Sequence, residues 1–429
     1  MRLSIESIAI SKVTSDGDKT NAKKGVLNVN IEELKQKICE DSRISSVDIE
    51  ILSPGDKVRI LNVQDVVQPR CKIGGDGDFP GFVSKMQTAG SGRTRSLLGV
   101  AVAVSNPETS RVESGILDMA GPAAEMSRYG KMSIVSVIPR KAAGVEERDF
   151  ENAVKKAGFK AAVYLAQGAK WHQVDEEEIF DLDIPNLEKN GLPRVACFYQ
   201  AYSPQFNFQA IPDAIVYGTE IGTMLPTVFH PNEVLDGAFV GWNALKALDT
   251  YSLQNHGVVR ELYRQHGKTL NFVGVVAATA NMTADARERS ACISAKLIKH
   301  VLGADGAILV KILGGMPHLD ISSTGAECEK LGIKTAVTTT PLTAIGTLSD
   351  TILFNEAALD LIITSGAPFE RSKVEFKAEK FLGGSPETVI YHPNKVLQHA
   401  GDQVIDIEQY LIAGFHDHTG GRKVVVKEY

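Results

Sequence analysis

The chain has 429 residues, of which 43% are hydrophobic and 23% are charged, and its net charge is −6. This length predicts about two or three domains with a sizeable core, and the composition excludes a disordered or fibrous chain. Because 52 acidic residues outnumber 46 basic ones, nucleic acid is not expected as a partner.

Five scattered cysteines predict a reducing compartment rather than a disulfide framework. No two of them stand at C-x-x-C spacing, so the usual signatures of structural zinc and of thiol redox pairs are missing. Residues 1–11 alternate like a strand rather than a signal peptide, and no apolar run approaches the roughly 18–20 residues that span a bilayer. We therefore expect a soluble, cytoplasmic protein.

Residues 1–130 are expected to form a β-rich domain. Strands are predicted at residues 3–10, 26–29, 47–52 and 57–63. The last two, joined by a Ser-Pro-Gly-Asp turn, predict a β-hairpin, and Asn30 is expected to cap a helix with Glu33 at the capping-box position. The glycine-rich residues 73–92 predict a loop, either a plain connection or a backbone cradle for a ligand. They do not fit G-x-G-x-x-G, and the chain has no Walker sequence.

Residues 131–267 are expected to form a middle α/β domain. Its predicted elements are strands at residues 134–138, 194–201 and 214–217 and a helix at residues 146–165. An acidic stretch at residues 175–183 is typical of a solvated boundary.

The clearest periodicity lies in residues 268–429, the predicted third domain. Strands are predicted at residues 271–278, 307–313, 335–339 and 361–364, and helices at residues 283–302 and 321–331. This alternation predicts a mainly parallel sheet with crossover helices, so the fold class is α/β after a β-rich N-terminal unit. A polar tail is expected from about residue 373.

In such sheets, ligands bind beyond the carboxyl ends of the strands. A Gly-Gly-Met-Pro-His loop stands at that edge and makes Gly314 and Gly315 candidate substrate-binding residues. His318, at the end of this loop, is the candidate catalytic residue for acid–base work, unless it merely caps the turn. Asp320 is interpreted as the cap of the following helix, and Cys328 within that helix as a core residue rather than a nucleophile.

His416 and His418 flank Asp417 near the end of the chain. Alternating histidines could hold a metal, but the sequence offers no obvious third ligand. The favoured interpretation is a solvated tail, and no metal is predicted.

The segment at residues 226–238 carries His230, Glu233 and Asp236, which are candidate substrate-binding residues. Its two prolines exclude one continuous helix. Together with its continuation at residues 239–249, the segment resembles the processing region of the glycine/sarcosine/betaine reductase component B alpha/beta precursor family, to which the proline reductase precursor is related.

Further stretches resemble the same family, in the same order, along residues 1–340. They are SPG at 53–55, FPGF at 79–82, GSGRT at 90–94, GILDM at 115–119, NFVGV at 271–275 and GADG at 303–306. Each stretch alone is a weak signal, but their colinear order is specific.

The resemblance implies a cytoplasmic reductase of amino-acid fermentation. In that family the precursor is cut at an Asn–Cys bond, which leaves a pyruvoyl group whose carbonyl forms an imine with an amine. A separate selenocysteine subunit attacks the substrate carbon, releases the amine and passes on a carboxymethyl group. The implied partners are therefore a small amine-type substrate and a Cys- or selenocysteine-containing subunit in a hetero-oligomer.

This chain departs from the family at the cleaved bond. Asn243 is present, but Ala244 follows it, and no Cys, Ser or Thr occurs in residues 241–249. Pyruvoyl formation needs a side chain that attacks the preceding carbonyl and then leaves, and a methyl group does neither. The sequence therefore predicts a lost processing site, an uncut chain and no pyruvoyl cofactor. An engineered Cys-to-Ala change is disfavoured because the residues after Ala244 also depart from the family.

Two functions fit this departure. In the first, the chain binds a substrate whose leaving group needs no imine. The indole of Trp242 would then form the bottom of a pocket for a cationic or apolar group; the alternative is that Trp242 packs in the core. In the second, the chain is a non-catalytic scaffold. A pocket lined by Asp236, Trp242, Asn243 and Ala244 together with the 314–318 loop favours the first, and Ala244 in solid core favours the second. A nucleotide-dependent ligase or kinase is disfavoured because no phosphate loop exists.

Overall fold

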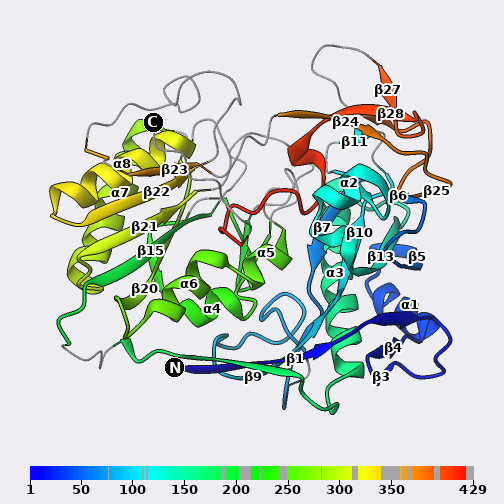
Figure 1. Cartoon of the computed structure of the whole chain (residues 1–429), viewed down its shortest axis with the longest axis horizontal. Helices are drawn as coiled ribbons and strands as arrows, with labels where there is room; N and C mark the ends of the chain where they lie inside the picture. Colours follow the sequence, from blue (N-terminus) through cyan, green and yellow to red (C-terminus); the bar gives the residue numbers. More distant parts are fainter. Residues whose placement is uncertain are drawn as a thin grey trace.

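The structure of the chain is a computed structural model. It describes residues 1–75, 77–108, 111–112, 115–184, 190–201, 214–222, 224–241, 249–281, 283–311, 317–339, 358–359, 361–364, 370–390 and 397–421. The described elements form two lobes of mixed α/β structure, one with most of the N-terminal strands and one with a long sheet (Figure 1). This confirms the predicted fold class. No described helix is long and apolar enough to cross a membrane.

Two four-stranded sheets form the framework of the N-terminal lobe. The first has the order β14 (Glu176–Asp181), β1 (Arg2–Ala9), β9 (Gly92–Leu98), β8 (Arg70–Lys72), and the second β5 (Ile44–Leu52), β13 (Ser133–Lys141), β10 (Val100–Ser105), β7 (Val63–Val67). The second sheet has a row of fully buried residues along β10, and the long helix α3 (Glu147–Gly168) packs on it with Phe150 and Phe159 in the core.

Shorter elements complete this lobe. They are β2 (Lys12–Thr14), β3 (Asn21–Lys23), β4 (Val26–Asn28), β6 (Val58–Ile60), β11 (Arg111–Val112), β12 (Leu117–Asp118), α1 (Ile31–Cys39) and α2 (Gly121–Met126). The Asn30 side chain caps α1 by accepting the Glu33 N–H at 3.0 Å, as predicted. The Glu33 carboxylate instead accepts a hydrogen bond from the Tyr164 hydroxyl at 2.9 Å, so it ties α1 to α3.

The predicted hairpin at residues 47–63 is wrong. Both strands and the turn between them exist, but β5 pairs with β13, whereas β6 pairs with β12 and β25 (Lys380–Leu382). The reason lies in Arg59 of β6, which is fully buried and needs the Asp118 carboxylate of β12. A buried charge without a partner is costly, so the ion pair takes precedence over local pairing.

The polar tail predicted from residue 373 is also wrong. The segment forms β24 (Arg371–Glu375), β25, β26 (Val389–Ile390), β27 (Gln398–His399) and β28 (Val404–Glu408), and it returns to the N-terminal lobe (Figure 1). Val374, Ile405 and Ile407 alternate with polar residues and are fully buried against Leu61 and Ile116. A period-two pattern among many polar residues was enough to build a half-buried sheet.

The second lobe is organised around a six-stranded sheet. Its order is β18 (Thr227–Phe229), β20 (Asn271–Thr279), β15 (Arg194–Ala201), β21 (Gly306–Val310), β22 (Lys334–Thr339), β23 (Ile362–Thr364). All neighbouring pairs are parallel except β18 with β20. The alternating strands and helices predicted for residues 271–364 are therefore confirmed, and β15 from the middle of the chain lies at the centre of the sheet.

Helices cover both faces of this sheet. Helices α4 (Pro231–Leu235), α5 (Thr250–Gln254) and α6 (Gly257–Gln265) lie on one side, where α6 contacts β15 and β20. Helices α7 (Ala284–Lys296) and α8 (Pro317–Lys330) pack against each other and on β20, β21 and β22. A small sheet of β17 (Thr219–Ile221), β16 (Ala214–Val216) and β19 (Phe239–Val240) flanks the lobe.

The strand order places a topological switch between β15 and β21. The chain leaves β15 towards β20 on one side, whereas it leaves β21 towards β22 on the other. In doubly wound sheets, the crevice for a ligand opens where two adjacent strands send their connections in opposite directions. A ligand site is therefore expected at the carboxyl ends of β15 and β21.

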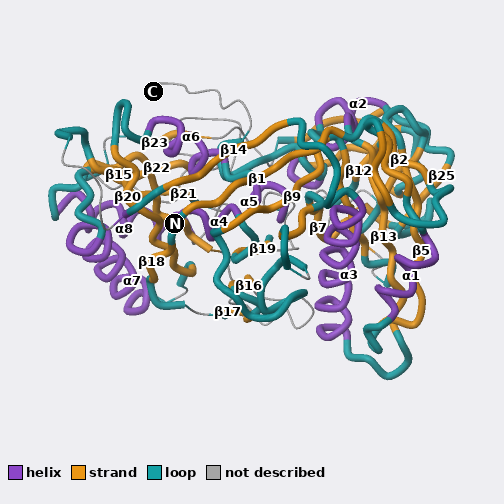
Figure 2. The backbone as a smooth tube through the Cα atoms, turned by 90° about the horizontal axis from the view of Figure 1, so that it is seen from below, coloured by secondary structure: helices purple, strands orange, loops and turns teal. Residues whose placement is uncertain are grey.

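The two lobes share long strands. Figure 2 shows β1, β9 and β14 crossing from one lobe to the other. On β1, Leu3 and Ile5 belong to the core under β15 and β20, whereas Ile8 belongs to the core under α3. The sheets also run across residues 131 and 268, because β13 pairs with β10 and β20 pairs with β15. The division into domains at 1–130, 131–267 and 268–429 stays a prediction.

Candidate functional site

His230 and Glu233 form the start of helix α4. His230 Nδ1 accepts the Asn232 N–H at 3.2 Å, and Glu233 Oε2 accepts the His230 N–H at 2.6 Å, which gives a capping box. The proton of the neutral ring then sits on Nε2 and is donated to the Leu182 carbonyl oxygen at 2.9 Å, and burial lowers the pKa of His230. Glu233 Oε1 also accepts the Tyr217 hydroxyl at 2.5 Å. These contacts are structural, and a substrate role for either residue stays a prediction.

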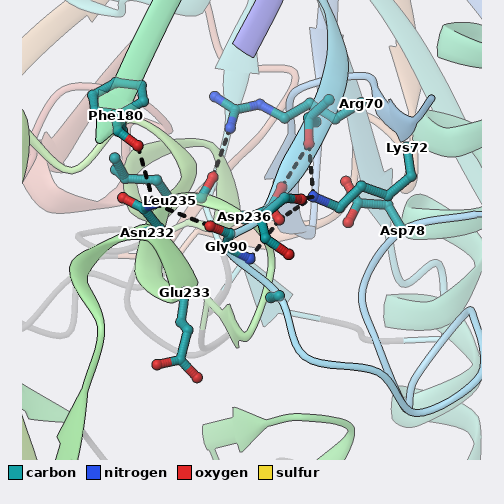
Figure 3. A network of polar contacts seen from close by, with 12 residues as sticks. Arg70, Lys72, Asp78, Gly90, Phe180, Asn232, Glu233, Leu235 and Asp236 are labelled. Atoms are coloured by element: carbon teal, nitrogen blue, oxygen red, sulfur yellow. Dashed lines mark hydrogen bonds and ion pairs between the residues drawn. The ribbon is translucent and has the colours of Figure 1, made fainter. Parts of the chain in front are cut away.

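Asp236 ends α4 and is only 1% exposed. Its carboxylate accepts the Gly90 N–H at 2.6 Å and the Thr94 hydroxyl at 2.7 Å, and it forms an ion pair with Lys72 (Figure 3). Such charge-assisted bonds are stronger than neutral ones. Asp236 therefore fastens the end of α4 to strands β8 and β9 of the N-terminal lobe, and both of its oxygens are engaged by the protein itself.

Within the glycine-rich residues 73–92, the Gly90 N–H binds a carboxylate of the protein itself. Gly90 has a φ of +92°, which favours glycine, and a Cβ there would lie 2.9 Å from the Cβ of Asn232. The side-chain amide of Asn232 in turn donates to the Gly90 carbonyl oxygen at 3.0 Å (Figure 3). Glycine is needed at this position because the loop backbone touches α4.

Asp78 lies beside this network and should respond to pH. Burial, reinforced by the charge of Asp236, raises the pKa of Asp78 to about 7. The folded protein therefore binds a proton that the unfolded chain lacks between about pH 4 and 7, so this residue costs stability as pH rises through that range. We expect Asp78→Asn to raise the free energy of unfolding by about 1–3 kcal/mol at pH 8 and to have little effect at pH 4.

Urea unfolding at the two pH values measures this difference. Asp16→Asn is the control, because Asp16 is exposed and the same substitution should leave stability unchanged at both values. Equal effects of Asp78→Asn at pH 4 and pH 8 would contradict the assignment of the raised pKa to this carboxyl.

Trp242, Asn243, Ala244, Gly314 and Gly315 lie outside the described residues. The pocket that would separate a substrate-binding subunit from a scaffold therefore stays a prediction. The ends of the two segments that contain these residues are described, at Gly241 and Asp249 and at Lys311 and Pro317.

The ends of the 242–248 segment are held together by a buried polar network. The Gly241 N–H donates to the Thr250 hydroxyl oxygen at 2.9 Å, and the Thr250 hydroxyl donates to Asp65 at 2.6 Å. Lys155 reaches from α3 to the Gly241 carbonyl oxygen. Burial lowers the pKa of Lys155 to about 8 and raises the pKa of Asp65 to about 6. Two buried groups of opposite charge thus lie next to Gly241 and Thr250.

Asp249 continues this network towards the end of the chain. It caps α5 by accepting the Ser252 N–H at 2.8 Å and accepts the Tyr129 hydroxyl at 2.5 Å. The neighbouring Arg128 binds Asp417 at 2.5 Å. The segment that resembles the processing region and the C-terminal His-Asp-His motif are therefore joined through residues of the N-terminal lobe.

The interpretation of His416 and His418 as a solvated tail is wrong. Both side chains are buried, with ring centroids 6.1 Å apart, and Asp417 between them accepts the Thr419 hydroxyl at 2.5 Å. A hydrogen bond joins the His418 ring to the backbone of Lys311, the residue that follows β21. The motif packs between the lobes because Arg128 supplies the cation that Asp417 needs. No group of three potential metal ligands occurs in the part of the chain that the structure describes.

His318 is fully buried in the first turn of α8. The helix begins at Pro317, earlier than predicted, so Asp320 lies within it rather than capping it; its carboxylate accepts the Asn281 N–H at 3.1 Å. The Gln200 side-chain amide at the end of β15 donates to the Pro317 carbonyl oxygen at 3.1 Å. Acid–base work by His318 stays a prediction. Cys328 is buried and burial raises its pKa to about 12, which fits a core residue.

Sequence reasoning missed Asp65, Lys155 and Lys311. A signal existed for the two lysines, because Lys155 interrupts the apolar face of a helix and Lys311 follows directly on an apolar strand before a Gly-Gly loop. A lysine in such a place has to be buried or to find a partner, which makes it a candidate functional residue.

Comparison with known proteins gives a family match over almost the whole chain. Residues 1–426 match the family of glycine/sarcosine/betaine reductase component B subunits. The glycine reductase complex component B subunits alpha and beta of Acetoanaerobium sticklandii are 34% identical, with all of both chains covered. The sarcosine reductase complex component B subunit alpha of Peptoclostridium acidaminophilum is 33% identical over 79% of each chain. The betaine reductase counterpart from the same organism is 30% identical, covering 85% of this chain and 84% of its own.

No solved structure matches this chain. The family match extends over almost every residue, and the curated relatives are similar in length and lie at or above 30% identity. The resemblance inferred from colinear motifs is thereby confirmed, and the chain belongs to the glycine/sarcosine/betaine reductase component B family.

Proposed function

We propose that this chain is the substrate-binding subunit of a cytoplasmic reductase complex that cleaves an amine-type small substrate without a pyruvoyl group of its own. The observation that carries the proposal is the match of residues 1–426 to component B, whose relatives are named for complexes that act on glycine, sarcosine and betaine. In the proposed complex, a thiol- or selenol-bearing partner subunit attacks the substrate carbon and this chain holds the substrate.

The residue at position 244 separates this chain from a self-processing subunit. A pyruvoyl group does not fit Ala244, because its methyl group cannot attack a carbonyl or leave in an elimination. The proposal therefore routes no step through that group. The described residues next to this segment include Lys155, Asp65 and Thr250, which take part in a buried polar network.

The proposed partner can be tested by co-purification. We expect the tagged chain, expressed in its native host, to retain a subunit with a reactive cysteine or selenocysteine, identified by mass spectrometry after labelling with iodoacetamide. Isothermal titration of this complex with glycine, sarcosine and betaine is expected to give binding of at least one of them. A partner without binding of any of the three would instead favour the scaffold function.

A further inference from the structure

Three neighbouring strands of the long sheet end in a row of buried polar side chains. Tyr199 of β15 is paired with Val310 of β21, and Val310 with Thr338 of β22, so Gln200, Lys311 and Thr339 follow side by side. Their exposures are 2%, 1% and 2%. The row lies at the carboxyl ends of the strands and includes the switch between β15 and β21.

Each member of this row has a polar atom without a hydrogen-bond partner among the described residues. These atoms are Gln200 Oε1, Lys311 Nζ and Thr339 Oγ1. The assignment for Gln200 does not depend on the choice between oxygen and nitrogen, because its other amide atom faces the Pro317 carbonyl oxygen and must be the donor. Burying a polar group without a partner costs free energy, and three in a row are not expected from packing alone.

The surroundings offer Lys311 no counter-ion within the described chain. Asp417 is engaged by Arg128 at 2.5 Å and by Thr419 at 2.5 Å. The ring of His418, which is hydrogen-bonded to the backbone of Lys311, is a base rather than an acid. Burial lowers the pKa of Lys311 well below its ordinary value. An anion bound next to Lys311 would therefore not have to compete with a carboxylate of the described chain for the Lys311 amine.

We infer that this row is the binding site for a small amino acid, whose carboxylate is held by Lys311 and Thr339 and whose N–H group donates to Gln200. The inference rests on the proposed function and names the substrate groups that the site would recognise. Adjacent strands lie roughly 4.8 Å apart, which suits a two-carbon ligand with a charged group at each end. A substrate nitrogen without hydrogen cannot donate to Gln200, so primary and secondary amines should bind more tightly than a quaternary one.

Substitution of Lys311 is expected to have opposite effects on stability and on glycine binding. Lys311→Met removes a buried amine without a partner, so we expect a higher melting temperature together with glycine binding weakened roughly tenfold to a hundredfold. Thr339→Val keeps the shape and removes one hydroxyl, and should weaken binding severalfold. Lys334→Met is the matched control, because Lys334 lies at the other end of β22 with its side chain 82% exposed, and should leave both quantities unchanged.

Isothermal titration of the purified complex with glycine, sarcosine, betaine and acetate separates this inference from the proposed function. Glycine bound equally by wild type and Lys311→Met would overturn the inference and leave the function standing. Acetate bound in a Lys311-dependent manner, without binding of the three amines, would support the carboxylate site and overturn the function. Binding of betaine tighter than sarcosine would overturn the role of Gln200, and absence of all binding would overturn both proposals.

Discussion

Denaturing mass spectrometry of the purified protein is expected to show one species of 46.3 kDa. The reason is chemical and local: the bond between Asn243 and Ala244 is flanked on its carboxyl side by a methyl group, which cannot start an acyl shift. Treatment with phenylhydrazine, which reacts with a pyruvoyl carbonyl, should add no mass to the chain.

Two fragments of about 243 and 186 residues, the parts of the 429-residue chain on either side of that bond, would contradict this expectation. Because a protease could also cut there, the control is the N-terminus of the smaller fragment. A free alanine would indicate proteolysis, whereas a blocked terminus would show that the chain makes the group by another route.

Asp118→Ala is expected to lower the free energy of unfolding by about 3–5 kcal/mol. Arg59 and Asp118 are both fully buried and joined by two hydrogen bonds of 2.8 Å, and Arg59 also donates to the Ala400 carbonyl oxygen at 2.7 Å. Removing the carboxylate leaves the guanidinium charge buried without its counter-ion. The midpoint of urea unfolding, followed by circular dichroism, measures the loss.

The double variant Arg59→Met with Asp118→Leu is the control for this prediction. Burial raises the pKa of Asp118 even beside Arg59, so the pair gains little net stability over apolar residues of similar size. We therefore expect the double variant to be clearly more stable than Asp118→Ala alone. If the double variant were as unstable as the single one, packing volume rather than the unpaired charge would be the cause.

The parts of the fold that could be predicted are those in which the pattern is local and strong. Residues 271–339 alternate continuous apolar runs with amphipathic stretches, and both the strands and the helices formed there. The pairing of β5 and β6 with partners far along the chain could not be predicted, because β6 follows the buried charge of Arg59 and not the turn beside it. The same holds for residues 371–421, whose alternating apolar residues are buried only when the N-terminal lobe is present.

The candidate site likewise has parts that could be predicted from the sequence and parts that could not. Lys311 follows β21 at the carboxyl edge of the parallel sheet, where the sequence predicted the chain to leave that strand, because strand order does not change which edge that is. The sequence predicted a substrate role for Asp236. The structure shows that its carboxylate is buried and binds Lys72 and the Gly90 N–H, so that it holds the two lobes together. Lys311 was missed although it follows an apolar run before two glycines, because a lysine is ordinarily exposed and only its strand neighbours put it out of reach of water.

The sequence by itself determined the family and the chemistry of position 244, because a colinear set of motifs and the absence of a nucleophile are properties of the chain alone. Only the tertiary structure decided that Gln200, Lys311 and Thr339 stand side by side and that His416 and His418 are buried. Register between parallel strands brings together residues as distant in sequence as Gln200 and Lys311, and the desolvation of a charge depends on everything that packs around it. No local pattern records such distances, so the site had to be found in the folded chain.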